Sequence, residues 1–208
     1  VLNQPYGGFA ETDLPMLAFA KWENRHDGYG SFADLDKARL DDVRAFHRDF
    51  YGPNNAVLGI VGDVTPEQGF ALAQKYFGKI PERATPPRPD VGESLNTVGK
   101  SIVEGDALAR LPALAVGWKM PERGSKDQAA MIVLGDLLAG GDASRLHQDL
   151  VKTKTLALQV DAFTGSGSPW EYDGPTLYTL TIVYKPDGKA DALLAAIDAQ
   201  IAGIVKDG

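Results

Sequence analysis

Apolar and polar positions alternate most clearly in the stretch 177–184, which predicts a strand with two differently composed faces. One face would carry Leu177, Thr179, Thr181 and Val183, and the other Tyr178, Leu180, Ile182 and Tyr184. Shorter apolar runs predict further strands over 97–103, 111–121 and 156–165. The run AVLGIVGDV, residues 56–64, is apolar on both faces, and it therefore predicts a buried central strand.

Helical spacing occupies most of the chain between these strands. An apolar stripe in 33–55 recurs every three or four residues, at Leu40, Val43, Phe46 and Phe50. Thr65, Pro66 and Gln68 form a capping box that predicts a helix ending at Gly78. Other helices are predicted near 15–24, over 126–139, as a turn and short helix in 140–153, and over 190–205.

The order of these elements predicts an α+β fold, with helices packed on a largely antiparallel sheet, because strands come in adjacent pairs rather than in strict alternation with helices. Four prolines lie between Ile80 and Ser94, and such segments are stiff and build cores poorly. We therefore expect two lobes, with residues 1–85 as the end of a first α+β domain. Residues 86–94 would be a Pro-rich linker, and residues 95–208 the start of a second α+β domain.

Charge and composition argue against several classes of binding partner and site chemistry. The chain of 208 residues has a net charge of -7 and a pI near 4.9. This balance disfavours nucleic acids and anionic membrane surfaces, which attract clustered Lys and Arg. The absence of cysteine excludes disulfides, thiolate zinc sites and cysteine nucleophiles. No apolar run reaches the roughly 18 residues that span a bilayer.

The strand-to-helix turn at Gly62 and Asp63 has the order of a phosphate-binding loop but lacks its chemistry. Neither P-loop nor dinucleotide glycine spacing is present. Asp63 would repel a phosphate, and Pro66 removes one amide donor from the helix N-terminus. A tight structural turn is the better interpretation.

Other candidate groups are scattered. His26, His47 and His147 lack the one-turn spacing of a zinc-binding helix, and HxxEH and HExxH are both absent. Acidic residues near the N-terminus show no EF-hand spacing, although a calcium site stays open there; they are Glu11, Asp13, Glu23 and Asp27. The GSGSP stretch, 165–169, has glycine where a nucleophile elbow has serine, and it indicates a hairpin loop.

The stretch GSPWEYDGP, 167–175, places Trp170 and Tyr172 on either side of Glu171. Such a loop either grips a partner or peptide, or folds back over a sheet edge. No residue of the chain is assigned a catalytic, metal-binding or cofactor-binding role.

Several motifs in order resemble the insulinase/pitrilysin-type zinc peptidases, a family that includes mitochondrial processing peptidase. They are YGPNN at 51–55, Gly62-Asp63, KYFGKIP at 75–81, the Pro-rich segment, and LAGGDASRL at 138–146. Residues 34–81 resemble the end of the family's first domain, and residues 111–160 resemble the opening of its second, non-catalytic domain. NQPYGGF at 3–9 resembles the segment that follows the metal site in bacterial members.

This resemblance implies paired α+β domains of the processing-peptidase-like metallohydrolase fold that enclose a peptide chamber. It also implies zinc in the full-length parent, held by HxxEH and a later glutamate that lies in the family just before the segment beginning at Val1. The chain alone is then expected to bind no catalytic zinc and to be inactive. The function implied is the non-catalytic portion of a bacterial zinc endopeptidase, which shapes the chamber and contacts the partner half.

One departure from the family concerns substrate contacts. Assisting halves of the family carry an Arg and a Tyr that contact the substrate backbone, and the alignment of LVKTKTLALQV puts Val151 and Leu158 at these positions. Neither side chain donates hydrogen bonds, so those roles are not carried over. We therefore expect that pair to come from another half or subunit.

Two alternatives stay open: a stand-alone scaffold subunit of the same family without peptidase activity, and an unrelated small-molecule enzyme that uses the acidic N-terminus and His26. Partners implied are the remaining domains or a second subunit, a peptide substrate in the parent, and a homodimer of this chain. The likeness to bacterial members suggests the periplasm, with the cytoplasm as the alternative.

Overall fold

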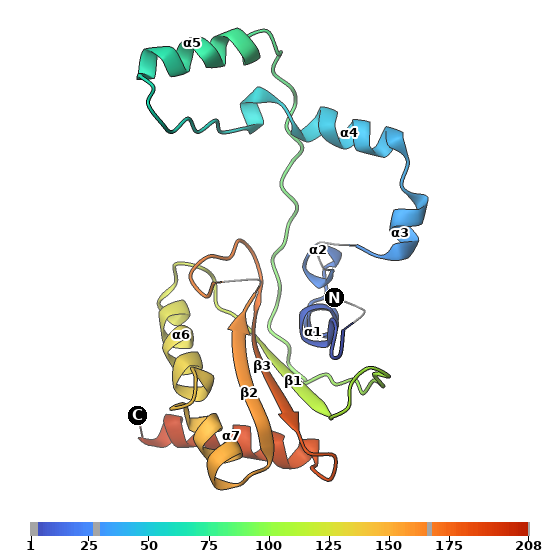
Figure 1. Ribbon diagram of the computed structural model, residues 1–208, viewed down its shortest axis with the longest axis vertical. Helices are drawn as coiled ribbons and strands as arrows, with labels where there is room; N and C mark the ends of the chain where they lie inside the picture. Colours follow the sequence, from blue (N-terminus) through green and yellow to red (C-terminus); the bar gives the residue numbers. More distant parts are fainter. Residues whose placement is uncertain (1–3, 27–29, 166–167, 208) are drawn as a thin grey trace. The chain divides into compact units, whose positions relative to one another are not determined.

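The computed structural model describes residues 4–26, 30–165 and 168–207. The chain divides into two compact units (Figure 1). Unit 1 comprises residues 1–28 and 91–208, and unit 2 comprises residues 29–90. The domain boundaries expected for the longer protein, at 85 and 95, stay a prediction.

Unit 1 is built on a three-stranded antiparallel sheet in the order β1-β3-β2. Its strands are β1 (Ala113–Lys119), β2 (Ala157–Thr164) and β3 (Leu177–Tyr184). The central strand β3 pairs Leu180 with Val116 on one side and Ile182 with Val160 on the other. The register shifts once, between Ala157 and Gln159.

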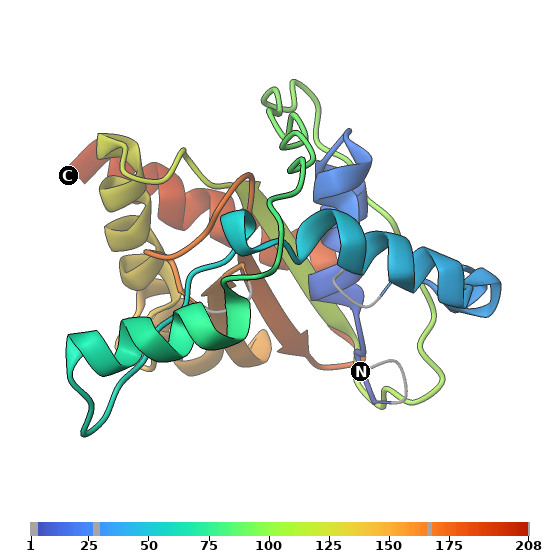
Figure 2. The ribbon, with the colours of Figure 1, turned by 90° about the horizontal axis from the view of Figure 1, so that it is seen from above.

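Helices cover one face of this sheet (Figure 1, Figure 2). They are α6 (Lys126–Ala139), the π-helix η3 (His147–Thr153) and α7 (Ala190–Asp207). Leu180 and Ile182 of β3 point to them and are almost fully buried. The core they share comprises Leu138, Ala139, Leu146, Leu150, Ala157, Val160, Leu180, Ile182, Leu193, Ala196 and Ile197. This packing confirms the α+β class.

The N-terminal segment of unit 1 packs on the other side of the sheet (Figure 1). It contains the π-helix η1 (Phe9–Asp13), α1 (Leu14–Ala18) and α2 (Trp22–Arg25). A Cβ at Gly117 of β1 would come within 3.4 Å of the side chain of Leu14. The same Cβ would lie 3.2 Å from the side chain of Leu177, so position 117 leaves little room for a side chain larger than that of alanine.

A buried carboxylate fastens this segment to the rest of unit 1. Glu93 accepts hydrogen bonds from the backbone amides of Ala20 (3.1 Å) and Lys21 (2.9 Å) and from the amide of Asn24 (3.0 Å). The Nζ of Lys119 lies 3.4 Å from it, and the side chains of Glu93 and Lys119 are only 5% and 11% exposed. Glu93 thus ties residues 20–24 to β1.

The charge of Glu93 is maintained against its own burial. Burial acts to raise its pKa, but the hydrogen bonds from Asn24, Lys21 and Ala20 and the charge of Lys119 together lower the pKa from 4.5 to about 2. The folded state therefore favours the ionised carboxylate. This contribution to stability is complete above pH 4.5 and is lost as the pH falls toward 2.

Unit 2 has helices but almost no interior. Its elements are α3 (Phe32–Lys37), α4 (Leu40–Phe50), the 3-10 helix η2 (Pro53–Asn55) and α5 (Pro66–Phe77). Among its described residues, Gly52 alone is buried. Polar contacts hold the chain together there: Arg83 donates to the carbonyl of Arg48 (2.9 Å), and Asn54 donates to the carbonyl of Arg83 (2.8 Å).

The structure corrects three sequence expectations. Residues 56–64 and 97–103 form no strand in the described part of the chain, and each range contains a bend. The former is not buried: Val57 and Val61 are fully exposed. A strand needs a neighbouring strand for its backbone groups, and apolar pattern alone does not supply one. The helix expected near 15–24 is two short helices, separated where Ala20 and Lys21 donate to Glu93.

The Glu93 contacts predict an acid-sensitive attachment of the N-terminal segment. The pKa change from 4.5 to about 2 corresponds to roughly 3 kcal/mol that favours the folded state at neutral pH. We expect Glu93→Gln to destabilise unit 1 at pH 7. The variant should also lack the part of the unfolding free energy that the unsubstituted chain loses between pH 4.5 and 2. Urea denaturation and amide exchange at Ala20 and Lys21 measure both effects.

Glu122→Gln is the matched control, since Glu122 is exposed. Equal stability of the Glu93→Gln and Glu122→Gln variants at pH 7 would contradict this role for Glu93.

Candidate functional site

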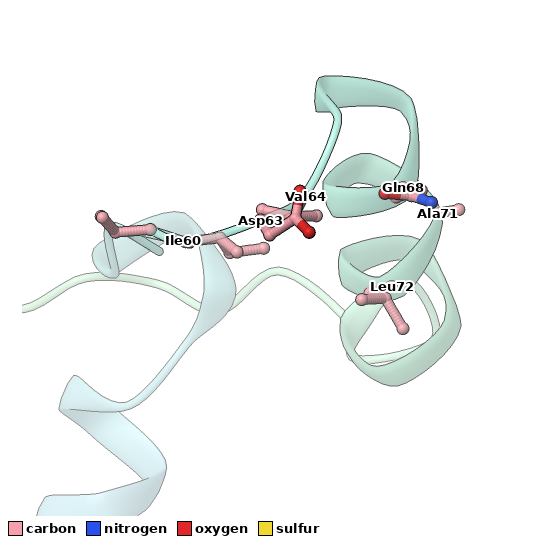
Figure 3. Close-up of a pocket in the computed structure, with 8 residues that line it drawn as sticks. Ile60, Asp63, Val64, Gln68, Ala71 and Leu72 are labelled. Atoms are coloured by element: carbon pink, nitrogen blue, oxygen red, sulfur yellow. The ribbon is translucent and has the colours of Figure 1, made fainter.

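A shallow hollow lies at the turn between the extended segment 56–64 and α5 (Figure 3). Its volume is about 660 Å³. Ile60, Val61, Gly62, Asp63 and Val64 line it from the segment, and Gln68, Ala71 and Leu72 line it from α5. The lining is mainly apolar, and Asp63 is the one charged residue in it.

The N-terminus of α5 has few amide donors left for an anion. The Thr65 hydroxyl accepts from the Gln68 amide (3.3 Å), and the Gln68 side chain accepts from the Thr65 amide (2.9 Å). Pro66 has no amide hydrogen. The predicted capping box is confirmed, and it occupies the donors that a phosphate would need.

The three histidines lie on separate elements. His26 stacks on Trp22, with ring centroids 4.0 Å apart, and its Nδ1 lies 2.7 Å from the Trp22 carbonyl oxygen. His47 stacks on Tyr51. His147 begins η3, and its Nε2 is buried without a hydrogen bond, 3.7 Å from Asp142. In the described ranges, no three His, Asp or Glu side chains come together as metal ligands.

The acidic residues near the N-terminus are also dispersed. Glu11 and Glu23 are exposed, Asp13 is half-buried, and Asp27 lies outside the described residues. Burial, and then the nearby charge of Glu104, raises the pKa of Asp13. Mutual repulsion of this kind is reduced by a proton as readily as by a cation, so it does not identify a metal site.

The loop after β2 is held by two contacts that the sequence did not reveal. Gln128 of α6 is buried; its side chain donates to the Pro169 carbonyl (2.9 Å) and accepts from the Gly124 amide (2.6 Å). The Tyr172 hydroxyl donates to the Pro121 carbonyl, and burial raises its pKa, although Arg123 acts to lower it. Trp170 between these contacts is 59% exposed.

Part of the GSGSP stretch, residues 166 and 167, lies outside the described residues. In the remainder, the Ser168 hydroxyl accepts a hydrogen bond from the Trp170 amide (3.2 Å), as in a structural turn. The Ser168 hydroxyl oxygen is therefore bonded to the backbone of its own loop. The expectation that this stretch is a hairpin loop agrees with its place between β2 and β3.

The two positions expected to replace the family's substrate-contacting pair lie in different settings. Val151 of η3 packs against the core of unit 1, and Leu158 of β2 is half-exposed. Their correspondence to the Arg and Tyr of assisting halves stays a prediction.

The two hydrogen bonds of Gln128 predict that it stabilises the loop. We expect Gln128→Ala to cost about 1–3 kcal/mol of unfolding free energy, because the variant leaves the Gly124 amide and the Pro169 carbonyl without their partner. Chemical denaturation measures the loss, and amide exchange at Gly124 reports it locally. Gln148→Ala is the control, since Gln148 is exposed and makes one side-chain bond. Equal losses in the two variants would contradict the prediction.

Comparison with known proteins gives the context for these observations. Residues 37–208 match the family model described as the peptidase M16 inactive domain. The zinc protease PqqE of Helicobacter pylori is 31% identical over 180 residues, which is 85% of this chain and 39% of that protein. An uncharacterized zinc protease of Mycobacterium leprae is 29% identical over 146 residues, which is 67% of this chain and 32% of that protein.

Solved structures agree with the sequence matches. The crystal structure of a protease from Helicobacter pylori superimposes with a TM-score of 0.72 at 26% identity, and the match covers 97% of this chain and 50% of that one. The structure of a peptidase M16 inactive domain from Pseudomonas fluorescens gives 0.72 at 16% identity and supports the fold alone. The chain thus spans half or less of these relatives. On the family match over 172 residues (37 to 208), it belongs to the peptidase M16, or insulinase, family through the inactive domain.

Proposed function

We propose that this chain is the non-catalytic portion of a bacterial zinc-dependent endopeptidase, where it shapes the peptide chamber and contacts the partner half. The catalytic zinc site would lie in another part of the parent protein. The observation that carries the proposal is the match to the inactive domain, in a chain that spans 39% of the zinc protease PqqE.

The uncovered apolar surface of unit 2 supports a role within a larger assembly. Leu40, Val43 and Phe46 project from α4 with more than half of their surface exposed. Phe70 and Tyr76 do the same on α5. An amphipathic helix normally buries such a face, so these side chains are suited to contact another domain.

The extended segment 56–64 supports the same role. Ile60 and Leu58 are partly shielded, whereas Val57 and Val61 project fully into solvent. Its branched apolar residues are those of a strand, and a strand from the partner half would satisfy its backbone. We propose that this segment joins a sheet when the remainder of the parent is present.

The second candidate function is a stand-alone scaffold subunit of the same family. The uncovered faces fit it equally well, because a scaffold also contacts other chains. An intact HxxEH in the parent protein supports the peptidase, and degenerate residues there support the scaffold.

Metal content tests the proposal directly. We expect the purified chain to hold no stoichiometric zinc by mass spectrometry after zinc loading and dialysis, and to cleave no peptide. Mixing it with the remaining portion of the parent should produce chelator-sensitive cleavage. Stoichiometric zinc together with chelator-sensitive cleavage by this chain alone would overturn the proposal.

Association through unit 2 is the second expected outcome. At high concentration the chain should form a dimer or larger species by size-exclusion chromatography with light scattering, because its apolar faces lack cover. Val61→Asp should shift it toward the monomer by placing a charge on the segment. Val205→Asp, the same substitution at an exposed position of α7, is the matched control. If the unsubstituted 208-residue chain were strictly monomeric at high concentration, this would count against the expectation.

A further inference from the structure

The helix η3 changes its hydrogen-bond spacing along its length. At its start the spacing is that of an α-helix, since the amide of Gln148 donates to the carbonyl of Ser144, four residues back (3.0 Å). At its end the spacing is that of a π-helix, since the amide of Lys154 donates to the carbonyl of Asp149, five residues back (2.8 Å). The wider π turn thus holds an additional residue that an α turn would not. Single π turns of this kind occur frequently at functional sites.

The turn after η3 contains a strained residue. Thr155 has a left-handed backbone conformation, with φ of 52°. This region is unfavourable for a β-branched residue, because the Cβ comes too close to the backbone carbonyl oxygen. The amide of Leu156 holds the turn in place by donating to the carbonyl of Leu150 (2.8 Å), a residue that is fully buried in the core. The strain at Thr155 therefore follows from the way in which η3 is joined to β2.

The irregularity continues into β2. Ala157 pairs with Tyr184 and Gln159 pairs with Val183, so two steps along β2 match one step along β3. Such a shift accommodates one additional residue in the strand that contains it. The π turn and the strand irregularity thus lie within one short segment, and each holds a residue that regular geometry would not accommodate.

Two buried polar atoms at the start of the segment add to this strain. The Oγ of Ser144 and the Nε2 of His147 have no hydrogen-bond partner among the described residues. Unpaired buried groups of this kind are unfavourable, and they are uncommon in folded proteins. Strained backbone clusters at switch regions, where a segment has two arrangements of similar free energy, so the segment 144–159 has the properties of such a region.

One ion pair fits the π spacing and does not fit an α-helix. The Nζ of Lys154 lies 2.7 Å from the Oδ2 of Asp149, whose side chain is 17% exposed. In an α-helix, side chains three or four residues apart are neighbours, whereas side chains five residues apart point in different directions. The pair of Asp149 and Lys154 spans five residues, so it stabilises the π turn and would separate if the helix became regular.

We propose that residues 151–158 form a conformational switch with two registers. In the register described above, the additional residue lies in the π turn, and the ion pair of Asp149 and Lys154 stabilises it. In the second register the Lys154 amide donates to the carbonyl of Leu150, as in an α-helix, and the additional residue moves into the turn before β2. The Leu156 amide then gives up its bond to Leu150, and Thr155 leaves the left-handed region.

The switch changes the surface that the segment presents. Residues 152–155 are exposed, and they would face in a different direction in the second register. A partner that contacts them in one register therefore selects that register. This proposal goes beyond the function proposed above and does not depend on it, since the switch requires no zinc and no cleavage.

Relaxation-dispersion NMR of the full 208-residue chain tests the proposal, because it detects exchange on the microsecond-to-millisecond timescale. We expect exchange at the amides of residues 152–156 and none at the amides of residues 193–201 in α7. The Leu156 amide is bonded in one register only, whereas Leu180 lies in the central strand of the sheet. Hydrogen exchange at Leu156 should therefore be at least about tenfold faster than at Leu180.

Two substitutions should change the population of the second register in opposite directions. Thr155→Gly should lower it about fivefold or more, because glycine adopts the left-handed conformation without strain. Lys154→Met should raise it about twofold, because it removes an ion pair that is partly exposed.

Each substitution has a matched control. Thr153→Gly makes the same change two residues earlier, within η3, where φ is not left-handed, and it should not lower the population. Lys152→Met removes an exposed lysine that has no ion pair among the described residues, and it should leave the population unchanged. Equal effects of Thr155→Gly and Thr153→Gly would overturn the proposal. A lack of exchange at residues 152–156 in the unsubstituted chain would overturn it without any variant.

Discussion

The central strand β3 is the constraint on which unit 1 depends, because it lies between β1 and β2 and pairs with both of them. Its backbone joins β1 to β2, and its even-numbered side chains anchor the helices. Tyr178 contributes a further link by donating to the carbonyl of Gly135 on α6. A Cβ at Gly135 would clash with the Tyr178 ring, so the small residue lets the helix lie directly on the strand.

The contrast between the two units follows from this constraint. Unit 1 has a strand with neighbours on both sides and therefore has an interior. Unit 2 has an apolar candidate, residues 56–64, which pairs with no strand among the described residues, and its helices bury almost nothing. Helices form there because their hydrogen bonds are local and their caps are intact, as at Thr65. An interior needs segments from distant parts of a chain to pack together, and this chain spans half or less of the relatives that it matches.

Residues that lie close together in the sequence were sufficient to predict some elements and contacts but not others. The bounds of α6 and the cap of α5 follow from residues within four positions of each other, so the pattern predicted them. Glu93 lies in a Pro-rich stretch that indicated a linker, yet it binds residues more than 65 positions away, including Ala20 and Asn24. Gln128 likewise holds a loop 41 residues distant. No spacing rule reveals such contacts, because they depend on how the segments fold back. The aromatic loop was recognised from composition, but the contacts that hold it, from Gln128 and Tyr172, belong to the tertiary structure.

The exposed run from Ala56 to Gly62 has a consequence for the tendency of the chain to aggregate. It is a seven-residue stretch of mostly branched apolar residues with no charge and no proline, which is the composition that promotes cross-β association. Pro53 on one side and Asp63 on the other are the kinds of residue that act as gatekeepers against such stacking. An unpaired run of this composition is open to association with other unpaired chains, and the pairing proposed above would remove that exposure.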